Sequence, residues 1–517
     1  MSTREIVRRL RSWESGRPLA RYGTLHHEIA EPQRTLIVSF IRMAGESRPW
    51  GIAWGHPGEQ PSTLSVSDGR VREDVATICA DFAETLLDHM RVHNWTYSPL
   101  PQGAERSDLR QVWVPNGQHI AMLHQLNYLY SQTKFGGDNN DLLKALGRLT
   151  GWLFRESTRI GHQHIIDASA ALSEAYAFPA QTVRTAHLGY QLAWLMASGD
   201  RAARHVAATT AEALPVSPTM DPRLEEDQLE VRVAKWQKAR REGTADVATE
   251  SEIATILDEE LRRRWQLTRD AYFVLAQDDR QINPGVGDLI DEAHREFWYQ
   301  LQRIELGLAD PSQGPAFTAH PETDFHGSAA ASRYLVHSAA DEALLGHLIH
   351  DDAELFEEAV AEGNAIRVTV TSVRNEGSGR TVIPVWEVAA PVGTQTRLRE
   401  NSRVVPVGHP GMQVIMREVQ QTDDSLVLIL EFKAGKTGLL HGIAKPVDPR
   451  WVGEAESFVV TDAADLTRRR SMRVWSARQG PGAWLTHGYT PPPVQIGDTA
   501  NDSDVLRDDV AQIGVTA

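Results

Sequence analysis

The spacing of apolar residues in this chain of 517 residues changes at Ala365, and this change constrains the fold most. Before Ala365, apolar residues recur mainly at steps of three and four, which is the spacing of amphipathic helices. After it, Ile366, Val368 and Val370 alternate with polar residues, and four more short apolar segments follow, separated by Gly, Asn or Asp. Five short strands with turns between them predict a small β-barrel over residues 365–480, ending in a basic helix.

The beginning of the chain also departs from helical spacing. Three short apolar segments of strand length lie around Phe40, Ile52 and Leu64, and helical spacing follows over residues 75–90. A helix after three strands can lie across the sheet that they form. We therefore expect residues 1–97 to form a small α/β domain.

Helical spacing dominates the middle of the chain. Leucines at steps of three and four between Leu142 and Leu153 predict one amphipathic helix, and similar patterns predict a helical bundle over residues 98–213. Three prolines within residues 215–222 then indicate a linker or a sharp boundary. Sustained helical spacing over residues 214–364 predicts a long helical arm, so the whole chain is expected to be an α+β multidomain protein.

Charge is distributed unevenly along the sequence. The net charge is −16, but residues 365–480 contain 16 basic and 12 acidic residues. Residues 481–517 are rich in proline and carry one basic and five acidic residues, so we expect a disordered acidic tail there. An acidic chain does not coat nucleic acid over its whole surface, and a polyanion-binding surface is therefore expected in the last third of the sequence.

Cysteine usage and hydropathy favour a cytoplasmic protein without membrane contact. Cys79 is the single cysteine, which excludes an intramolecular disulfide and cysteine-based zinc sites. No apolar stretch approaches about 18 residues, and the N-terminal residues lack the apolar run of a secretory signal.

The densest basic feature is a group of arginines on one predicted helix, next to Trp475. Its members are Arg468, Arg469, Arg470 and Arg473. At helical spacing their guanidinium groups form a band able to bind phosphates, although the same helix can instead pair with the acidic remainder of the protein. Lys433 and Lys436 add positive charge to the barrel, and Trp386 or Trp475 offers a ring on which single-stranded bases can stack.

Nucleotide hydrolysis is not expected. The string LEFKAGKT contains Lys436 but has Leu430 where a phosphate-binding loop needs its first glycine. No GxSxG, HExxH or GxGxxG motif occurs either, so the sequence predicts no cofactor.

Two patterns support an alternative function as a metal-dependent hydrolase. Four metal-binding side chains fall within two turns of one predicted helix: His347, His350, Asp351 and Glu354. Glu431 and Lys433 form an ExK pair of the kind that metal-dependent nucleases use to hold a divalent ion and a water. Both patterns are more typical of a solvated helix or strand face.

The order of elements over residues 249–480 resembles the accessory stalk and β-barrel of superfamily 1 helicases of the surveillance type. The order is a long helical arm, the doublet Asp351-Asp352, a short helix and a barrel that contains the string TRLRENSRVVPVG. In such helicases the barrel contacts nucleic acid and the motor follows. Here Gln479–Gly488 lacks the motor's lysine and too few residues follow for a motor domain. The resemblance therefore implies a motor-less accessory protein with a separately encoded ATPase or helicase as its partner.

These observations favour a non-catalytic nucleic-acid-binding or adaptor protein over an enzyme. The barrel and basic helix are expected to contact nucleic acid, preferably single-stranded, because a small barrel can provide a stacking surface. The acidic helical body is expected to bind a protein partner.

Overall fold

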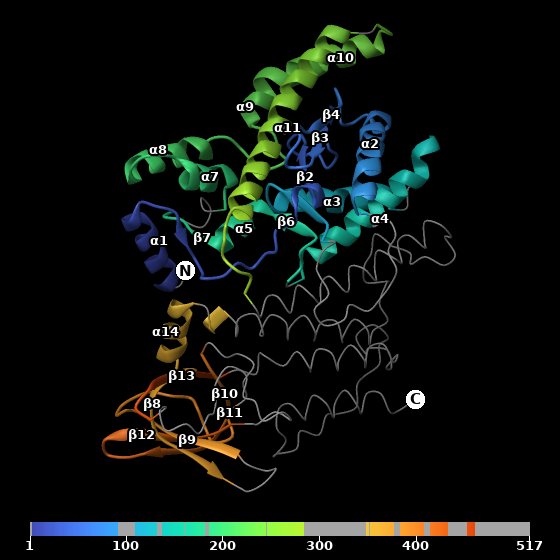
Figure 1. Cartoon of the computed structure of the whole chain (residues 1–517). Helices are drawn as coiled ribbons and strands as arrows, with labels where there is room; N and C mark the ends of the chain where they lie inside the picture. Colours follow the sequence, from blue (N-terminus) through green and yellow to red (C-terminus); the bar gives the residue numbers. More distant parts are fainter. Residues whose placement is uncertain are drawn as a thin grey trace, which may run out of the picture. The chain divides into compact units, whose positions relative to one another are not determined.

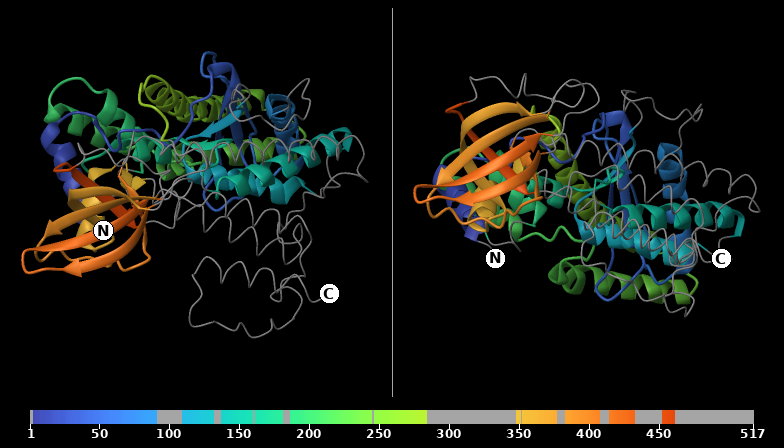
Figure 2. Two further views of the ribbon diagram at one scale, coloured as in Figure 1. Left: turned by 60° about the horizontal axis from the view of Figure 1, so that its bottom comes forward. Right: turned by 90° about the horizontal axis from the view of Figure 1, so that it is seen from below.

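The structure is a computed structural model, and it describes part of the chain. The described residues are 3–90, 109–131, 137–159, 161–180, 186–244, 246–283, 348–350, 352–376, 383–407, 414–432 and 452–460. The chain forms two compact units, Met1–Phe325 and His326–Ala517, which Figures 1 and 2 show from three directions. Both units contain helices and sheet, as an α+β fold requires.

A mixed sheet of five strands lies at the centre of the first unit. Its strands are β2 (Thr35–Ile41), β3 (Gly51–Gly55), β4 (Ser62–Ser65), β5 (Gln111–Val114) and β6 (Ile165–Asp167). The order across the sheet is β4-β3-β2-β5-β6; β2, β3 and β4 pair antiparallel, whereas β5 and β6 continue the sheet in parallel to β2. All seven residues of β2 are buried, because helices cover both faces of this central strand.

Helices form a layer on each side of the sheet (Figure 1). The described α-helices of the first unit are α1 (Thr3–Ser15), α2 (Arg72–Met90), α3 (Gly117–Tyr130), α4 (Asn140–Glu156), α5 (Ala168–Ala175), α7 (Leu188–Met196), α8 (Arg201–Glu212), α9 (Pro222–Leu224), α10 (Glu230–Arg241) and α11 (Val247–Ala276). Leu36, Val38 and Phe40 pack with α2, α3 and α4, whereas Ile37 and Ile41 pack with α5, α7 and α11. A separate two-stranded sheet pairs β1 (Leu19–Ala20) with β7 (Tyr176–Ala177).

The expected domain boundary at residue 97 separates strands that belong to one sheet. β5 and β6 lie within residues 98–213, where we expected only a helical bundle, and they pair with β2 from the preceding segment. The two strands have only four and three residues, too few to show a period of their own between helices.

The helical arm expected over residues 214–364 is also corrected in its described part. α11 packs against β2, β3, β4 and β5 as part of the helical layer. Leu261 and Trp265 are buried, and the Nε1 of Trp265 donates to the carbonyl of Ile37 at 3.2 Å. Gly51 permits this close approach, since a Cβ there would lie 2.8 Å from Leu261 Cδ1. The spacing of apolar residues indicates that one face of a helix is buried, but it does not indicate which part of the protein that face packs against.

The second unit is built on six antiparallel strands and one described helix. The elements are α14 (Ala353–Ala361), β8 (Ala365–Glu376), β9 (Ile383–Pro391), β10 (Arg403–Pro406), β11 (Val414–Gln421), β12 (Ser425–Phe432) and β13 (Ala455–Val460). In the order β10-β11-β12-β9-β8-β13 each strand pairs with two neighbours, because β13 also pairs with β10. All five predicted strands are present, and β13 is a sixth that the sequence analysis missed.

No helix among the described residues combines the length and apolar character needed to cross a membrane.

Candidate functional site

Trp386, which we expected to stack on bases, belongs to the barrel core. Its side chain is 0% exposed, and its ring centroid lies 4.7 Å from that of Phe432. Trp386, Val388 and Ala390 point to the same side of β9 and are all buried. The strand register thus turns the ring inward, where no base can reach it, and the stacking role is corrected.

The other predicted nucleic-acid contacts lie outside the described residues. They are Lys433, Lys436, Arg468, Arg469, Arg470, Arg473 and Trp475. Two of the four predicted metal ligands, His347 and Asp351, also lie outside them, whereas His350 and Glu354 are described. In the described parts of the chain, no three His, Cys, Asp or Glu side chains come together to hold a metal ion. The predicted nuclease carboxylate, Glu431, accepts a hydrogen bond from Arg417 Nε at 2.6 Å.

Three arginines lie at the junction of the β9–β10 connection with β10. Arg397 and Arg399 are exposed on either side of Leu398, which is buried in the barrel core, and Arg403 begins β10. Asn401 adopts a φ of 67° and its N–H donates to the Met416 carbonyl at 2.7 Å. We call Arg397, Arg399 and Arg403 the arginine loop.

The charge of the arginine loop is not neutralised by described acidic residues. Arg367 pairs with Glu357, Arg374 with Glu376 and Glu387, and Arg417 with Glu376 and Glu431. Within the described residues, no such ion pair involves the arginine loop. Guanidinium groups bind phosphate oxygens in a planar, two-pronged geometry, so this loop is suited to a phosphate backbone.

The second place to seek a site is the carboxyl edge of the sheet. Open α/β sheets bind ligands outside the carboxyl ends of their strands, where neighbouring strands lead to opposite sides. In the sheet order, the strand that follows β2 in the sequence lies on one side of it, and the strand that follows β5 lies on the other side. A ligand site of this kind would therefore lie between the carboxyl ends of β2 and β5. β5 ends at Val114, and past this point residues 214–220 lie beside the end of β2 in place of β5. The Arg42 N–H donates to the Pro218 carbonyl at 2.8 Å, and the Met220 N–H donates to the Arg42 carbonyl at 3.1 Å.

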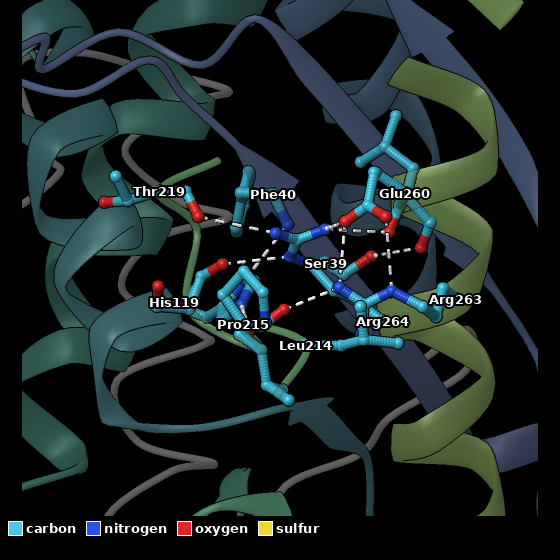
Figure 3. A network of polar contacts seen from close by, with 12 residues as sticks. Ser39, Phe40, His119, Leu214, Pro215, Thr219, Glu260, Arg263 and Arg264 are labelled. Carbon is cyan, nitrogen blue, oxygen red and sulfur yellow. Dashed lines mark hydrogen bonds and ion pairs between the residues drawn. The ribbon is translucent and has the colours of Figure 1, made fainter. Parts of the chain in front are cut away.

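Every backbone carbonyl from Leu214 to Thr219 accepts a hydrogen bond, and Figure 3 shows much of this network. In chain order the donors are His187 Nε2 (3.1 Å), Arg263 Nη2 (2.6 Å), His119 Nε2 (2.9 Å), Arg264 Nε (2.9 Å), Arg42 N–H (2.8 Å) and Arg264 Nη2 (3.4 Å). We call residues 214–220 the plug segment. The prediction of a linker from the prolines is therefore wrong, because hydrogen bonds hold this segment against the sheet and α11.

Arg264 is the buried centre of this network. Its side chain is 0% exposed, and Nη1 lies 2.5 Å from Glu260 Oε2. Burial lowers the pKa of Arg264 to about 10. Burial alone would raise the pKa of Glu260, but the hydrogen bond from Arg263 and the charge of Arg264 outweigh it and lower this pKa. The pair is charged, and removing Glu260 would leave the fully buried Arg264 without its acidic partner.

His119 and Ser39 also lie at this edge, and both serve the network. His119 Nδ1 accepts from the Phe40 N–H at 3.1 Å, which assigns the ring proton to Nε2, the donor to Val216. Burial lowers the pKa of His119 to about 3, so the ring is neutral. Ser39 Oγ donates to the Leu261 carbonyl at 3.2 Å. Ser39 and His119 could in principle act as a nucleophile and a base, but both bind backbone groups instead.

A histidine and a carboxylate meet near α5, which sequence spacing did not indicate. His27 Nε2 lies 2.8 Å from Glu174 Oε2, and the Gln163 side chain contacts the His27 ring at 3.4 Å. Burial opposes a charge on His27, but Glu174 outweighs it and raises the pKa of His27. Both ring nitrogens of the neighbouring His162 lie on carbonyls, of Arg159 and Ile165. The cluster therefore ties loops together and leaves His162 no nitrogen for a metal.

No protein family matches the sequence, and neither a curated protein nor a solved structure matches the chain.

Proposed function

We propose that this chain is a non-catalytic nucleic-acid-binding adaptor whose arginine loop contacts the phosphate backbone. The observation that carries the proposal is the contrast within the barrel: Arg367, Arg374 and Arg417 are neutralised by glutamates, whereas the arginine loop is not paired with any described acidic residue. Phosphate contacts supply most of the affinity of such proteins and need no base-specific geometry.

The plug segment supports the non-catalytic part of this proposal. It occupies the edge of the sheet where substrates of open α/β sheets bind, and its carbonyls from Leu214 to Thr219 all accept hydrogen bonds. A substrate could enter there only after the buried Arg264 had lost its hydrogen bonds to the Ser217 and Thr219 carbonyls. The first unit then acts as a scaffold, with an acidic surface for a protein partner.

The proposed nucleic acid is single-stranded, and the proposed partner is a separately encoded ATPase or helicase. The single strand follows from the stacking surface expected of a small barrel, for which Trp475 is the remaining candidate ring because Trp386 is buried. The partner follows from the resemblance of residues 249–480 to a helicase stalk and barrel. The predicted basic helix with Arg468, Arg469, Arg470 and Arg473 is a second proposed set of phosphate contacts.

A binding assay with matched arginine variants tests the proposal. Fluorescence polarisation of a labelled single-stranded oligonucleotide is measured at low salt with the full chain. We expect Arg397→Gln/Arg399→Gln to weaken binding by about tenfold or more, because two phosphate contacts are lost. Arg367→Gln/Arg374→Gln removes equal charge from the same barrel and should change affinity far less. Equal effects of the two pairs, or no binding by the unmodified chain, would contradict the proposal.

A further inference from the structure

A cavity of about 190 Å³ opens on the first unit between the β2–β3 connection and α10. Its apolar side is formed by Met43, Trp50, Leu229 and Val233, all of them buried. Small-molecule sites usually have volumes of about 300 Å³ or more, so this cavity suits a smaller group. Its apolar wall can cover the methylene stem of one side chain.

Two carboxylates also line the cavity. Glu225 and Glu230 line it together with one cation, Arg70, which is already paired with Glu46 at 2.8 Å. Both oxygens of Glu225 face the Ala44 N–H, at 3.1 and 3.2 Å. A carboxylate can accept about four hydrogen bonds, so Glu225 keeps capacity for another donor.

An unusual helical turn places the two glutamates on one side. Residues Glu225–Leu229 form a π-helical turn, closed by the Glu230 N–H donating to the Glu225 carbonyl. In an α-helix, residues five apart would point about 140° away from each other. The wider turn brings both carboxylates to the same cavity, and such turns occur frequently at functional sites.

We infer that this cavity, which we call the acidic pocket, receives a lysine or arginine side chain of a protein partner. The apolar wall covers the aliphatic stem, and Glu225 and Glu230 bind the cationic head. Arginine side chains inserted into such pockets are frequent anchors of protein interfaces. The inference rests on the adaptor role proposed above and names the chemistry of the partner. An anionic ligand is disfavoured by the same two carboxylates.

The acidic pocket is tested with small probes and the full chain, without nucleic acid. N-acetyl-arginine methylamide and its uncharged analogue N-acetyl-norleucine methylamide are titrated to about 10 mM by saturation-transfer NMR, above the dissociation constant expected of fragments this small. We expect the arginine probe to bind and the norleucine probe to bind about tenfold more weakly or not at all.

Two pairs of variants locate the binding. Ala234 is exposed and lines the pocket, so Ala234→Trp should block it, with Val231→Trp on the same helix as the control. Glu225→Gln/Glu230→Gln should weaken arginine binding by about tenfold, whereas Glu226→Gln, exposed and outside the lining, should not. Thermal melting checks that each variant is folded.

No binding of the arginine probe, equal binding of the norleucine probe, or equal losses in the control variants would overturn the inference. These outcomes are independent of the oligonucleotide assay. If the arginine probe does not bind but the oligonucleotide does, this inference alone is overturned. If the arginine probe binds but the oligonucleotide does not, the proposed function alone is overturned.

Discussion

Mild acid should weaken the first unit through His119, which holds the plug segment. The ring is fully buried, accepts from the Phe40 N–H and has a pKa lowered to about 3 from 6.5. Below pH 6.5 the unfolded chain therefore binds a proton at His119 that the folded chain refuses, so stability is lost as the pH falls from 6.5 towards 3. Between pH 7 and pH 5 this single histidine should lower the free energy of unfolding by about 2 kcal/mol.

The magnitude is measured as a difference, because buried His89 and His162 also have lowered pKa values. Urea unfolding, followed by tryptophan fluorescence at pH 7 and pH 5, is compared between the unmodified chain and His119→Gln. At pH 7 the variant should be less stable by about 1–3 kcal/mol, since it disturbs the bonds to Phe40 and Val216. On acidification it should lose about 2 kcal/mol less than the unmodified chain. Parallel losses in the two proteins would refute the assignment of a buried, neutral ring.

Three further predictions concern the plug network, helix packing and nucleotide chemistry. Arg264→Met removes the hydrogen bonds to the Ser217 and Thr219 carbonyls and should cost about 3–5 kcal/mol in urea unfolding, whereas Arg262→Gln, which breaks the exposed pair with Asp258, should cost at most about 1 kcal/mol; similar costs would contradict the network. Gly147→Ala would put a Cβ 2.3 Å from the Ser131 N, so it should lower stability by about 3 kcal/mol, and an unchanged melting temperature would show that α3 and α4 do not cross this closely. The purified chain should hydrolyse no ATP in a phosphate-release assay, because Leu430 replaces the first glycine of a phosphate loop; turnover abolished by Lys436→Ala would overturn this prediction.

The spacing of apolar residues predicted two kinds of element: strands that pair with a strand near in the sequence, and helices with a long buried face. The strands β2, β3 and β4, the helices α2 and α4, and five barrel strands all lie where the period indicated. Sequence spacing missed β5 and β6, because short parallel strands pair with a distant segment and show no alternation. It also could not place α11, whose face is buried against strands about 200 residues away.

The candidate sites were harder to predict than the elements. Prolines 215 and 218 are typical of a linker, and nothing local reveals that His119 and Arg264 bind the carbonyls around them. The arginine loop lay within a string noted only for its strand-turn-strand pattern, since spacing does not show which arginines are neutralised. Trp386 lies two residues before Val388, so both side chains point to the same face of β9, and that face is buried. The alternation of the strand therefore predicts a buried ring, whereas the aromatic character of Trp386 alone had suggested a stacking surface.

The salt dependence of oligonucleotide binding tests the central claim most directly. Polarisation of a labelled single strand is titrated at several salt concentrations for the unmodified chain, Arg397→Gln/Arg399→Gln and Arg367→Gln/Arg374→Gln. Each phosphate contact contributes about −0.7 to the slope of log K against log salt, so the loop variant should have a slope shallower by about 1.4. The control pair should keep the slope of the unmodified chain. A loop variant with an unchanged slope would contradict a phosphate contact at this loop.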